Sequence, residues 1–227
     1  MWNERTLTLL GKNAVNILEN STVAVFGVGG VGSYAVECLV RAGVGHIELI
    51  DDDVYSETNL NRQLYATLDT IGKHKTDVAA ERIRSINPSC VVVPRPMRYN
   101  AETSGEFDLA SYDYVVDAID SLDCKTLLIK NCTSLGVKII SSMGAGNRRR
   151  PQCFDVMDIY STSNDPLAKA LRQRLRKEGV KKLKTVCSTE LPAKAEEGRV
   201  VGSLSCVTAA AGTILAGEVI NGLIENK

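Results

Sequence analysis

The chain has 227 residues, of which 44% are hydrophobic and 24% are charged, and these proportions are typical of a soluble globular protein. Lys and Arg together number 27, as do Asp and Glu, so the formal net charge is zero and a site for a polyanion must come from local clustering. Only 5% of the residues are aromatic, which argues against a protein that binds single strands by stacking bases on aromatic side chains. The length fits one large α/β domain or two small ones.

Two features of the sequence bear on the cellular compartment. The cysteines include no Cys-x-x-Cys pair, so neither a zinc knuckle nor a thioredoxin-type redox site has the spacing that it needs. The opening Met-Trp-Asn-Glu-Arg has neither the basic start nor the apolar run of a signal peptide. We therefore expect reduced thiols and a cytoplasmic protein.

Short β-branched runs alternate with helical stretches over the first 145 residues, and this order is typical of βαβ units with a parallel sheet. The run Thr22–Phe26 is continuously apolar, as expected for a strand that is covered on both faces. The patterns predict strands at 22–26, 46–50, 90–93, 112–119 and 137–141, and helices at 32–42, 73–86 and 122–135. The expected fold class is α/β, a Rossmann-like, doubly wound and mainly parallel sheet.

The pattern changes after residue 145. It predicts a strand at 154–160 and a basic helix that begins at Asp165-Pro166 and ends at about Glu178. Residues 180–200 are rich in Lys, Glu, Pro and Gly, and this composition predicts a mobile loop. We expect a single domain over residues 1–227, with a nucleotide-binding core at about 20–147 and a C-terminal extension at about 148–227 that packs on it.

The segment 207–224 is apolar over a length that raises the question of a membrane span. It is rich in Ala and Gly, and it carries Glu218 and Asn221 near its end. Small residues suit a helix packed inside a core or across a subunit interface. This composition favours a buried helix, and we expect no membrane association.

A glycine-rich loop follows the first predicted strand and precedes a helix. Gly27, Gly29 and Gly32 satisfy the GxGxxG spacing, and Gly30 adds a fourth glycine. Glycines let the backbone come close to a phosphate, whose charge is met by amides at the helix N-terminus. Asp51, at the end of the second strand, is placed to bind a ribose hydroxyl. The loop predicts a nucleotide site, and taken alone it leaves open a nicotinamide or flavin dehydrogenase.

Charged and amide side chains follow the ribose-binding strand and favour a triphosphate. Arg62 and Lys75 offer two cations, whereas a dehydrogenase has little need of fixed cations beyond those for a pyrophosphate. Asp120 follows the strand at 112–119, at the carboxyl edge of the sheet, where it could hold Mg²⁺. Together these residues predict chemistry on ATP.

These motifs resemble the ThiF/MoeB-like adenylating family, which shares its fold with ubiquitin-activating enzymes. The resemblance covers essentially the whole chain, and it rests on Gly27–Gly32, Asp51–Asp53, Asn59–Gln63, Lys75 and Asp117–Asp120. Members of this family bind Mg-ATP and adenylate a carboxylate with release of pyrophosphate. The zinc Cys-x-x-Cys pairs of many family members are absent here.

The resemblance implies roles for individual residues. Asp51 is expected to bind the ribose, with Asp53 beside it, and Asp120 to serve Mg²⁺ and the reacting phosphate. The residues expected around the phosphates are Asn59, Arg62, Gln63 and Lys75. Arg5, six residues before Gly11, matches an arginine that the family lends to the neighbouring subunit. The resemblance therefore also implies a homodimer.

One branch of the family resembles this chain in further stretches, namely Asp117–Ser121, Ser142–Asn147, Asp165–Lys169, Leu171–Arg176 and Cys187–Glu190. That branch comprises the tRNA threonylcarbamoyladenosine dehydratases. They use ATP to activate the threonyl carboxylate of a modified adenosine, and an internal nucleophile then closes a ring with net loss of water. The resemblance implies this activity and a tRNA partner.

A basic tract at residues 148–184 is an independent argument for a polyanion. The tract contains eleven Lys and Arg residues against four Asp and Glu residues. Such a concentration in a neutral protein suits a phosphate backbone. A solvated basic helix, or a carrier protein with an acidic face, fits the same pattern.

Three alternatives stay open at this point. An adenylating enzyme could act instead on the C-terminal carboxylate of a ubiquitin-like sulfur carrier, with a sulfur-transfer protein as a further partner. A dehydrogenase or a non-catalytic nucleotide-binding module would leave Arg62 and Lys75 without a role. Cys187 stands in the predicted mobile loop, where Lys182 and Lys184 could lower its pKa and make it a nucleophile.

Overall fold

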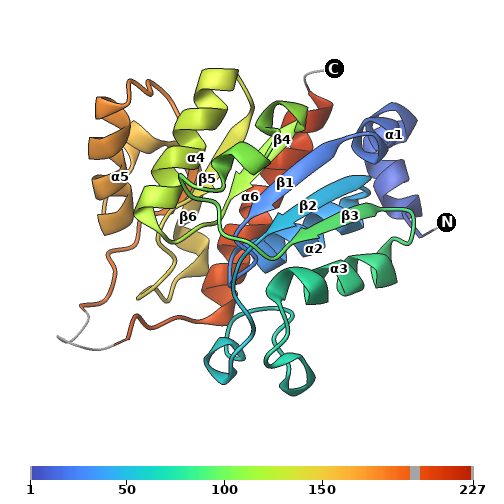
Figure 1. The fold of residues 1–227 in the computed structure, drawn as a ribbon, viewed down its shortest axis with the longest axis horizontal. Coiled ribbons are helices and arrows are strands. Elements are labelled where there is room, and N and C mark those ends of the chain that lie inside the picture. Colours follow the sequence, from blue (N-terminus) through green and yellow to red (C-terminus); the bar gives the residue numbers. More distant parts are fainter. Residues whose placement is uncertain (1, 195–199, 226–227) are drawn as a thin grey trace.

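Within the described residues, 2–194 and 200–225 of the computed structural model, seven strands form one sheet in the order β3-β2-β1-β4-β5-β7-β6 (Figure 1). The strands are β1 Thr22–Phe26, β2 His46–Ile50, β3 Val91–Arg95, β4 Tyr114–Asp117, β5 Ile139–Ser142, β6 Phe154–Asp158 and β7 Lys184–Ser188. All neighbours are parallel except β6, which runs antiparallel to β7. The predicted α/β fold with a mainly parallel sheet is confirmed.

Helices cover both faces of the sheet (Figure 1). They are α1 Glu4–Glu19, α2 Gly32–Ala42, α3 Lys75–Ile86, α4 Leu122–Leu135, α5 Pro166–Lys177 and α6 Ser205–Ile224. Residues of α1, α2, α3 and α6 share one core cluster, and those of α4 and α5 pack on the other face. Local chemistry sets several helix ends: Gly43 and Gly136 end α2 and α4 in the left-handed conformation, and Asp165 caps α5.

The central strand β1 shows why an apolar run folds this way. Val23 and Val25 point into the core shared with α2 and α6, whereas Ala24 and Phe26 point into the core shared with α4. Alternate side chains of a strand face opposite sides of the sheet, so both faces of this strand must be apolar. The prediction of a strand covered on both faces is confirmed.

The prediction of a mobile loop over residues 180–200 is wrong in its first half. Lys184–Ser188 forms β7, which lies between β5 and β6 inside the sheet. The strand pairs with both neighbours, and its last four residues are buried. Backbone pairing and burial outweigh the polar composition of the flanking residues. Residues 195–199 lie outside the described part of the chain.

Helix α6 is, among the described helices, the one long and apolar enough to cross a membrane, by length and composition. One face of it is buried, as Val207, Leu215 and Val219 show. A Cβ atom at Gly212 would overlap the carbonyl oxygen of Val31, so the small residue permits a close approach to α2. The helix thus packs in the core as predicted, with a second face that is partly exposed.

The strand order places the carboxyl end of β1 at a topological switch point. Its two neighbours are β2 and β4, and the chain leaves them toward opposite faces of the sheet. Ligands of doubly wound folds bind at the carboxyl edge next to such a point. A ligand is therefore expected to bind at the loops that follow β1, β2, β4 and β5.

Candidate active site

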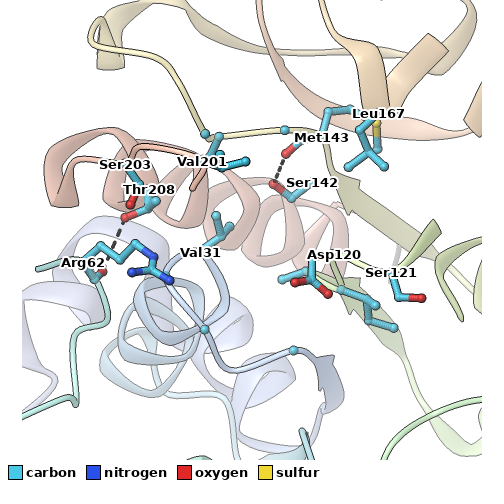
Figure 2. Close-up of a pocket in the computed structure, with 18 of the residues that line it drawn as sticks. Val31, Arg62, Asp120, Ser121, Ser142, Met143, Leu167, Val201, Ser203 and Thr208 are labelled. Atoms are coloured by element: carbon cyan, nitrogen blue, oxygen red, sulfur yellow. Dashed lines mark hydrogen bonds between the residues drawn. The ribbon is translucent and has the colours of Figure 1, made fainter. Parts of the chain in front are cut away.

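A cavity of about 960 Å³ opens at this edge of the sheet (Figure 2). Residues that follow β1, β2, β4 and β5 line it, together with the start of α5 and the segment that leads into α6. In the view of Figure 2, Arg62 and Asp120 lie on opposite sides of the cavity. Most of the predicted site residues line this cavity: Gly27, Gly29, Gly30, Asp51, Asp53, Asn59, Arg62, Gln63, Lys75 and Asp120.

The glycine loop presents bare backbone to the cavity. Gly27 has a φ of +90°, and a Cβ atom there would lie 2.6 Å from the carbonyl oxygen of Ala118. Both the backbone conformation and this close contact exclude a side chain at position 27. At Gly29, a Cβ atom would meet only the Gln63 amide within 4 Å, at 3.7 Å, because this glycine faces open space. That space next to a helix start is what a phosphate needs.

Gly32 does not line the cavity, and its role as a cofactor-binding residue stays a prediction. It is buried at the start of α2, where a Cβ atom would overlap the carbonyl oxygen of Gly27. Its lack of a side chain lets the helix pack closely against the loop. Gly32 thus shapes the loop from behind.

Asp51 holds the glycine loop and the turn after β2. Its two carboxylate oxygens accept hydrogen bonds from the backbone N–H groups of Val28, at 2.7 Å, and of Asp53, at 2.9 Å. Burial raises the pKa of the Asp51 carboxyl above its ordinary value, while Lys75 and these two N–H groups oppose that rise. Each oxygen keeps a second lone pair, so the carboxylate can also accept from a ribose hydroxyl.

Lys75 is a buried cation at the first position of α3. Its Nζ atom lies 2.6 Å from an Asp53 oxygen and 3.8 Å from an Asp51 oxygen. The lysine side chain is 6% exposed, whereas that of Asp53 is 66% exposed. The exposed Asp53 can exchange this contact for solvent, which frees the ammonium for a phosphate oxygen.

The segment after β2 fixes three amide and guanidinium groups. Asn59 is buried, and its side-chain oxygen accepts from the N–H of Ser56 at 3.0 Å. Arg62 donates to the carbonyl oxygen of Thr58 at 2.7 Å through one nitrogen, so its remaining N–H groups are available to a ligand. The buried Oε1 atom of Gln63 has no hydrogen-bond partner among the described residues. An unpaired buried oxygen costs free energy until a partner fills the cavity.

Asp120 lies exposed after β4, and the turn before it is built by a buried side chain. One oxygen of Asp117 accepts from the N–H of Ile119 at 3.1 Å, which shapes the residues that lead to Asp120. No described residue forms a hydrogen bond or ion pair with the Asp120 carboxylate. The carboxylate is therefore available for a cation, and the exposed Arg98 is a nearby positive charge.

Oxygen donors for a divalent cation lie at this end of the cavity. Asp51, Asp52 and Asp53 bring carboxylate oxygens within 4.8 Å of one another, and Asp120 lines the same cavity. The oxygens of Asp51 already accept from the backbone, so the exposed carboxylates are the better donors. Hard carboxylate oxygens suit Mg²⁺ held jointly with phosphates, and the residues present fit that ion.

Arg5 is exposed on α1 and does not line the cavity of its own chain. The family resemblance places this arginine in the neighbouring subunit's site, and that role stays a prediction. Helix α1 itself has non-helical backbone at Gly11, where φ is +81°.

The other half of the cavity is lined by residues that sequence reasoning did not assign to the site. They are Ser142–Arg148 from the end of β5 onward, Asp165–Leu167 at the start of α5, and Pro192 and Ala193 after β7. Ser142 and Leu167 are labelled in Figure 2. For residues 142–148, the position directly after the predicted strand at 137–141 was a signal that could have found them.

A segment before α6 crosses this half of the cavity. Gly202 exchanges two hydrogen bonds with Asn147, at 2.7 and 2.8 Å, and the Asn61 amide donates to the carbonyl oxygen of Ser203 at 3.1 Å. Val201 packs against Gly146, where a Cβ atom would overlap its side chain. The crossing segment is thus pinned at both sides of the cavity.

The cations of the basic tract at residues 148–184 differ in exposure and in pairing, and the contact of this tract with RNA stays a prediction. Arg148 is buried, Arg172 bonds to backbone oxygens, Arg174 pairs with Asp123, and Lys184 pairs with Glu218. These four cations therefore already have partners within the folded chain, although Arg174 and Lys184 remain partly accessible to solvent. The exposed cations of the tract are Arg149, Arg150, Lys169, Arg176, Lys177, Lys181, Lys182 and Lys184.

Cys187 is not in a mobile loop, and its interpretation as an activated nucleophile is wrong. The thiol is fully buried in β7. Burial raises the pKa of Cys187 to about 12, with the nearby Asp165 adding to the rise. A thiol with this pKa stays protonated at neutral pH and is a poor nucleophile.

Comparison with known proteins decides the family. The model of the ThiF family matches residues 3–227. The chain belongs to the ThiF family. The predicted family is confirmed.

Members of the ThiF family similar to this chain include enzymes that modify tRNA. The tRNA threonylcarbamoyladenosine dehydratase of Bacillus subtilis (strain 168) is 42% identical over 234 residues, which cover 96% of this chain and 92% of the relative. A crystal structure of the E. coli enzyme of that name, TcdA, in complex with ATP superimposes with a TM-score of 0.91 at 35% identity, covering 98% of this chain and 93% of that one. Adenylyltransferase and sulfurtransferase UBA4 of Saccharomyces cerevisiae (strain YJM789) is 36% identical over 130 residues, which cover 57% of this chain and 29% of the relative.

Proposed function

We propose that this chain is an ATP-dependent tRNA threonylcarbamoyladenosine dehydratase. The observation that carries the proposal is the two-sided cavity of about 960 Å³, with a phosphate-binding half and a second half beside it. The similarity to a dehydratase crystallised with ATP, over almost the full length of both chains, supports the same activity. The reaction adenylates the threonyl carboxylate, which then cyclises with net loss of water.

The residues around the glycine loop bind ATP. The bare backbone at Gly29 and the unpaired oxygen of Gln63 leave room and hydrogen-bonding capacity for the nucleotide. Asp51 accepts from the ribose, and Arg62 and Lys75 offset charge on the phosphates as the α-phosphorus is attacked. Asn59 orients the same segment through its contact with Ser56.

The acceptor carboxylate enters over the ends of β4 and β5. One of its oxygens attacks the α-phosphorus, the bond to the pyrophosphate oxygen breaks, and pyrophosphate leaves. An internal nucleophile of the substrate then attacks the activated carbonyl carbon and expels AMP. Mg²⁺, when bound through Asp120 and the phosphates, neutralises negative charge on the triphosphate.

The exposed cations of the basic tract contact the tRNA backbone, and the enzyme acts as a homodimer in the cytoplasm. Arg5 is exposed and does not line the cavity of its own chain, which suits a role in the neighbouring subunit. Mixing Arg5→Ala with Asp120→Ala protomers tests this role. Because a mixed dimer holds one site with neither change, the mixture should recover activity that both parents lack, and no recovery would contradict it.

Nucleoside mass spectrometry tests the function. Purified protein, ATP and Mg²⁺ are incubated with tRNA that carries threonylcarbamoyladenosine, and the expected result is an ATP-dependent loss of one water from that nucleoside. Asp120→Ala should nearly abolish AMP formation while the circular dichroism spectrum stays unchanged. No mass change with folded, ATP-binding protein would contradict the dehydratase activity.

A second candidate substrate is the C-terminal carboxylate of a ubiquitin-like sulfur carrier. The similarity to UBA4 over 57% of this chain favours it, because that relative is an adenylyltransferase and sulfurtransferase. The chemistry at the α-phosphorus would be the same, and a sulfur-transfer protein would be a further partner. ATP–pyrophosphate exchange that depends on such a carrier and not on RNA would support this function instead.

A further inference from the structure

Arg148 is a buried guanidinium that contacts three separate segments of the chain. Its Nε atom donates to the carbonyl oxygen of Gly144 at 2.9 Å, and its Nη2 atom donates to that of Asn164 at 3.2 Å. The Nη1 atom donates to the carbonyl oxygen of Glu190. These acceptors follow β5, precede α5 and follow β7, so one side chain joins three loops.

The charge of Arg148 is balanced by Asp165. Their nearest atoms lie 2.7 Å apart, and the two side chains are 1% and 0% exposed. The same Asp165 oxygen accepts from the N–H of Gly144 at 3.0 Å, and the other oxygen caps α5 by accepting from Ala168 at 2.7 Å. A buried carboxylate with so many donors is fixed in position, and it fixes the backbone around it.

These loops form one side of the active-site cavity, which we name the acceptor wall: residues 144–148, 165–167 and 192–193. The nucleotide-binding residues follow β1 and β2, whereas the acceptor wall consists of segments that follow β5 and β7 and of the start of α5. Strand β5 is two places from β1, a displacement of about 10 Å. The wall therefore borders the half of the cavity beyond the phosphates.

We propose that Arg148 is a positioning residue for the acceptor: it holds the wall against which the substrate carboxylate is presented to ATP. This inference rests on the proposed function for the nature of the acceptor. The sequence Arg148-Arg149-Arg150 suggests an RNA-binding surface, whereas the proposal gives Arg148 a structural role inside the protein. Arg149 and Arg150 are exposed, whereas Arg148 is turned inward.

Glu190 supports the same arrangement from the other side. Its carboxylate accepts from the backbone N–H of Arg149 at 3.1 Å and of Arg150 at 2.9 Å, and these bonds lower the pKa of the Glu190 carboxyl. The segment after β7 is thus joined to the loop after β5 by both the side chain and the carbonyl group of Glu190. The geometry needs the planar fork of arginine, which a lysine cannot reproduce.

Arg148→Lys tests the proposal because it keeps the charge and loses the fork. We expect kcat/KM for the modified tRNA to fall at least about tenfold, mainly through KM for tRNA, while Kd for ATP changes less than about twofold. The salt dependence of tRNA binding should stay unchanged, because no phosphate contact is lost. Arg149→Met is the comparison, and it should lower the slope of log K against log salt by about one.

The opposite pattern overturns the inference. If folded Arg148→Lys has a kcat/KM within twofold of the wild type, Arg148 has no positioning role. If the variant instead lowers the salt slope of tRNA binding, Arg148 contacts the RNA. If Arg148→Lys does not fold, Arg148→Gln, which retains one donor group for Asp165, takes its place in the same comparison.

A readout without turnover separates this inference from the proposed function. The N–H of Gly144 donates to Asp165, so its hydrogen exchange measured by NMR reports on the acceptor wall. We expect Arg148→Lys to accelerate that exchange at least about tenfold and to leave exchange at β1 unchanged. Unchanged exchange at Gly144 would overturn the positioning role even if the wild type proves inactive on tRNA.

Discussion

The Nζ atom of Lys125 lies 2.8 Å from an oxygen of Asp117, and both side chains are fully shielded from solvent. The lysine also donates to the hydroxyl of Ser141 and to the carbonyl oxygen of Ser142, each at 3.1 Å. The pair therefore joins α4 to the ends of β4 and β5, directly beneath the turn that presents Asp120.

Lys125→Met should destabilise the protein by about 3–5 kcal/mol, because it leaves the Asp117 carboxylate buried without its counter-charge. Urea unfolding measures this loss. The double variant Lys125→Met with Asp117→Asn removes both charges and should recover at least about 1 kcal/mol of it. If Lys125→Met alone lowers the free energy of unfolding by less than about 1 kcal/mol, the stability of the protein does not depend on the counter-charge that Lys125 gives Asp117.

Lys75→Met should lower kcat/KM for ATP by about 10²–10³-fold, since the variant lacks a cation that offsets charge in the transition state. AMP formation in steady state measures the effect, with urea midpoints taken in parallel. Lys73→Met is the matched control, because Lys73 is exposed and does not line the cavity. It should stay within about twofold of the wild type, and a Lys75→Met value equally close would contradict the assignment.

Cys187→Ala should keep AMP formation near the wild-type rate, because a buried thiol with a pKa of about 12 supplies no thiolate. Alkylation at pH 8 should label the exposed Cys206 in the native protein and Cys187 only after unfolding. A folded Cys187→Ala protein that loses activity more than a hundredfold would restore the nucleophile hypothesis.

The raised pKa values of the buried thiols also predict that the free energy of unfolding falls at high pH. Burial raises the pKa of Cys187 and Cys132 to about 12 and that of Cys90 to about 11, from an ordinary value of 9.0. The native state keeps these protons where the unfolded chain loses them, so the stabilisation is complete below about pH 9 and is lost as pH rises toward the native pKa values. Each thiol contributes up to about 1.4 kcal/mol per pH unit in that window. Urea unfolding from pH 8 to 10.5 should show a shallower decline for Cys187→Ala than for the wild type.

Neutralising an exposed cation of the basic tract should weaken tRNA binding in a salt-dependent way. Lys177→Met and Lys182→Met are each expected to reduce the slope of log K against log salt by about one, because each removes one phosphate contact. Lys138→Met lies outside the tract, just before β5, and should leave the slope unchanged. Filter binding over 50–200 mM salt measures the slope for each variant. Equal slopes in all three variants would exclude the tract as the RNA contact.

Much of the fold could be predicted because its signals are local. The glycine loop, the capped ends of α2 and α4, and the Asp165-Pro166 start of α5 each need only neighbouring residues. Strand β7 could not be predicted in this way. Its five residues follow a lysine-rich stretch, and they become a strand because β5 and β6 pair with them on both sides. Such pairing depends on residues distant in the sequence.

The site likewise has one half that local sequence signals predict and another half that they do not. The phosphate half was predicted from residues that follow β1 and β2 in close succession. The acceptor wall was not predicted, because it is assembled from three loops that meet only after folding. Arg148 shows the difficulty: it stands beside two exposed arginines, and its inward contacts are to Asp165 and to backbone carbonyl oxygens of separate loops. A charge count cannot distinguish a surface cation from a buried one.

The packing of α6 on α2 has a consequence for how the protein is made. Helix α2 is among the first elements to leave the ribosome, yet the apolar face that it presents to Gly212 and its neighbours is covered only when α6 has been synthesised. Until then the nascent chain carries an open apolar surface along the central strands. Such an intermediate is prone to aggregation and is a natural client for chaperones that bind emerging chains.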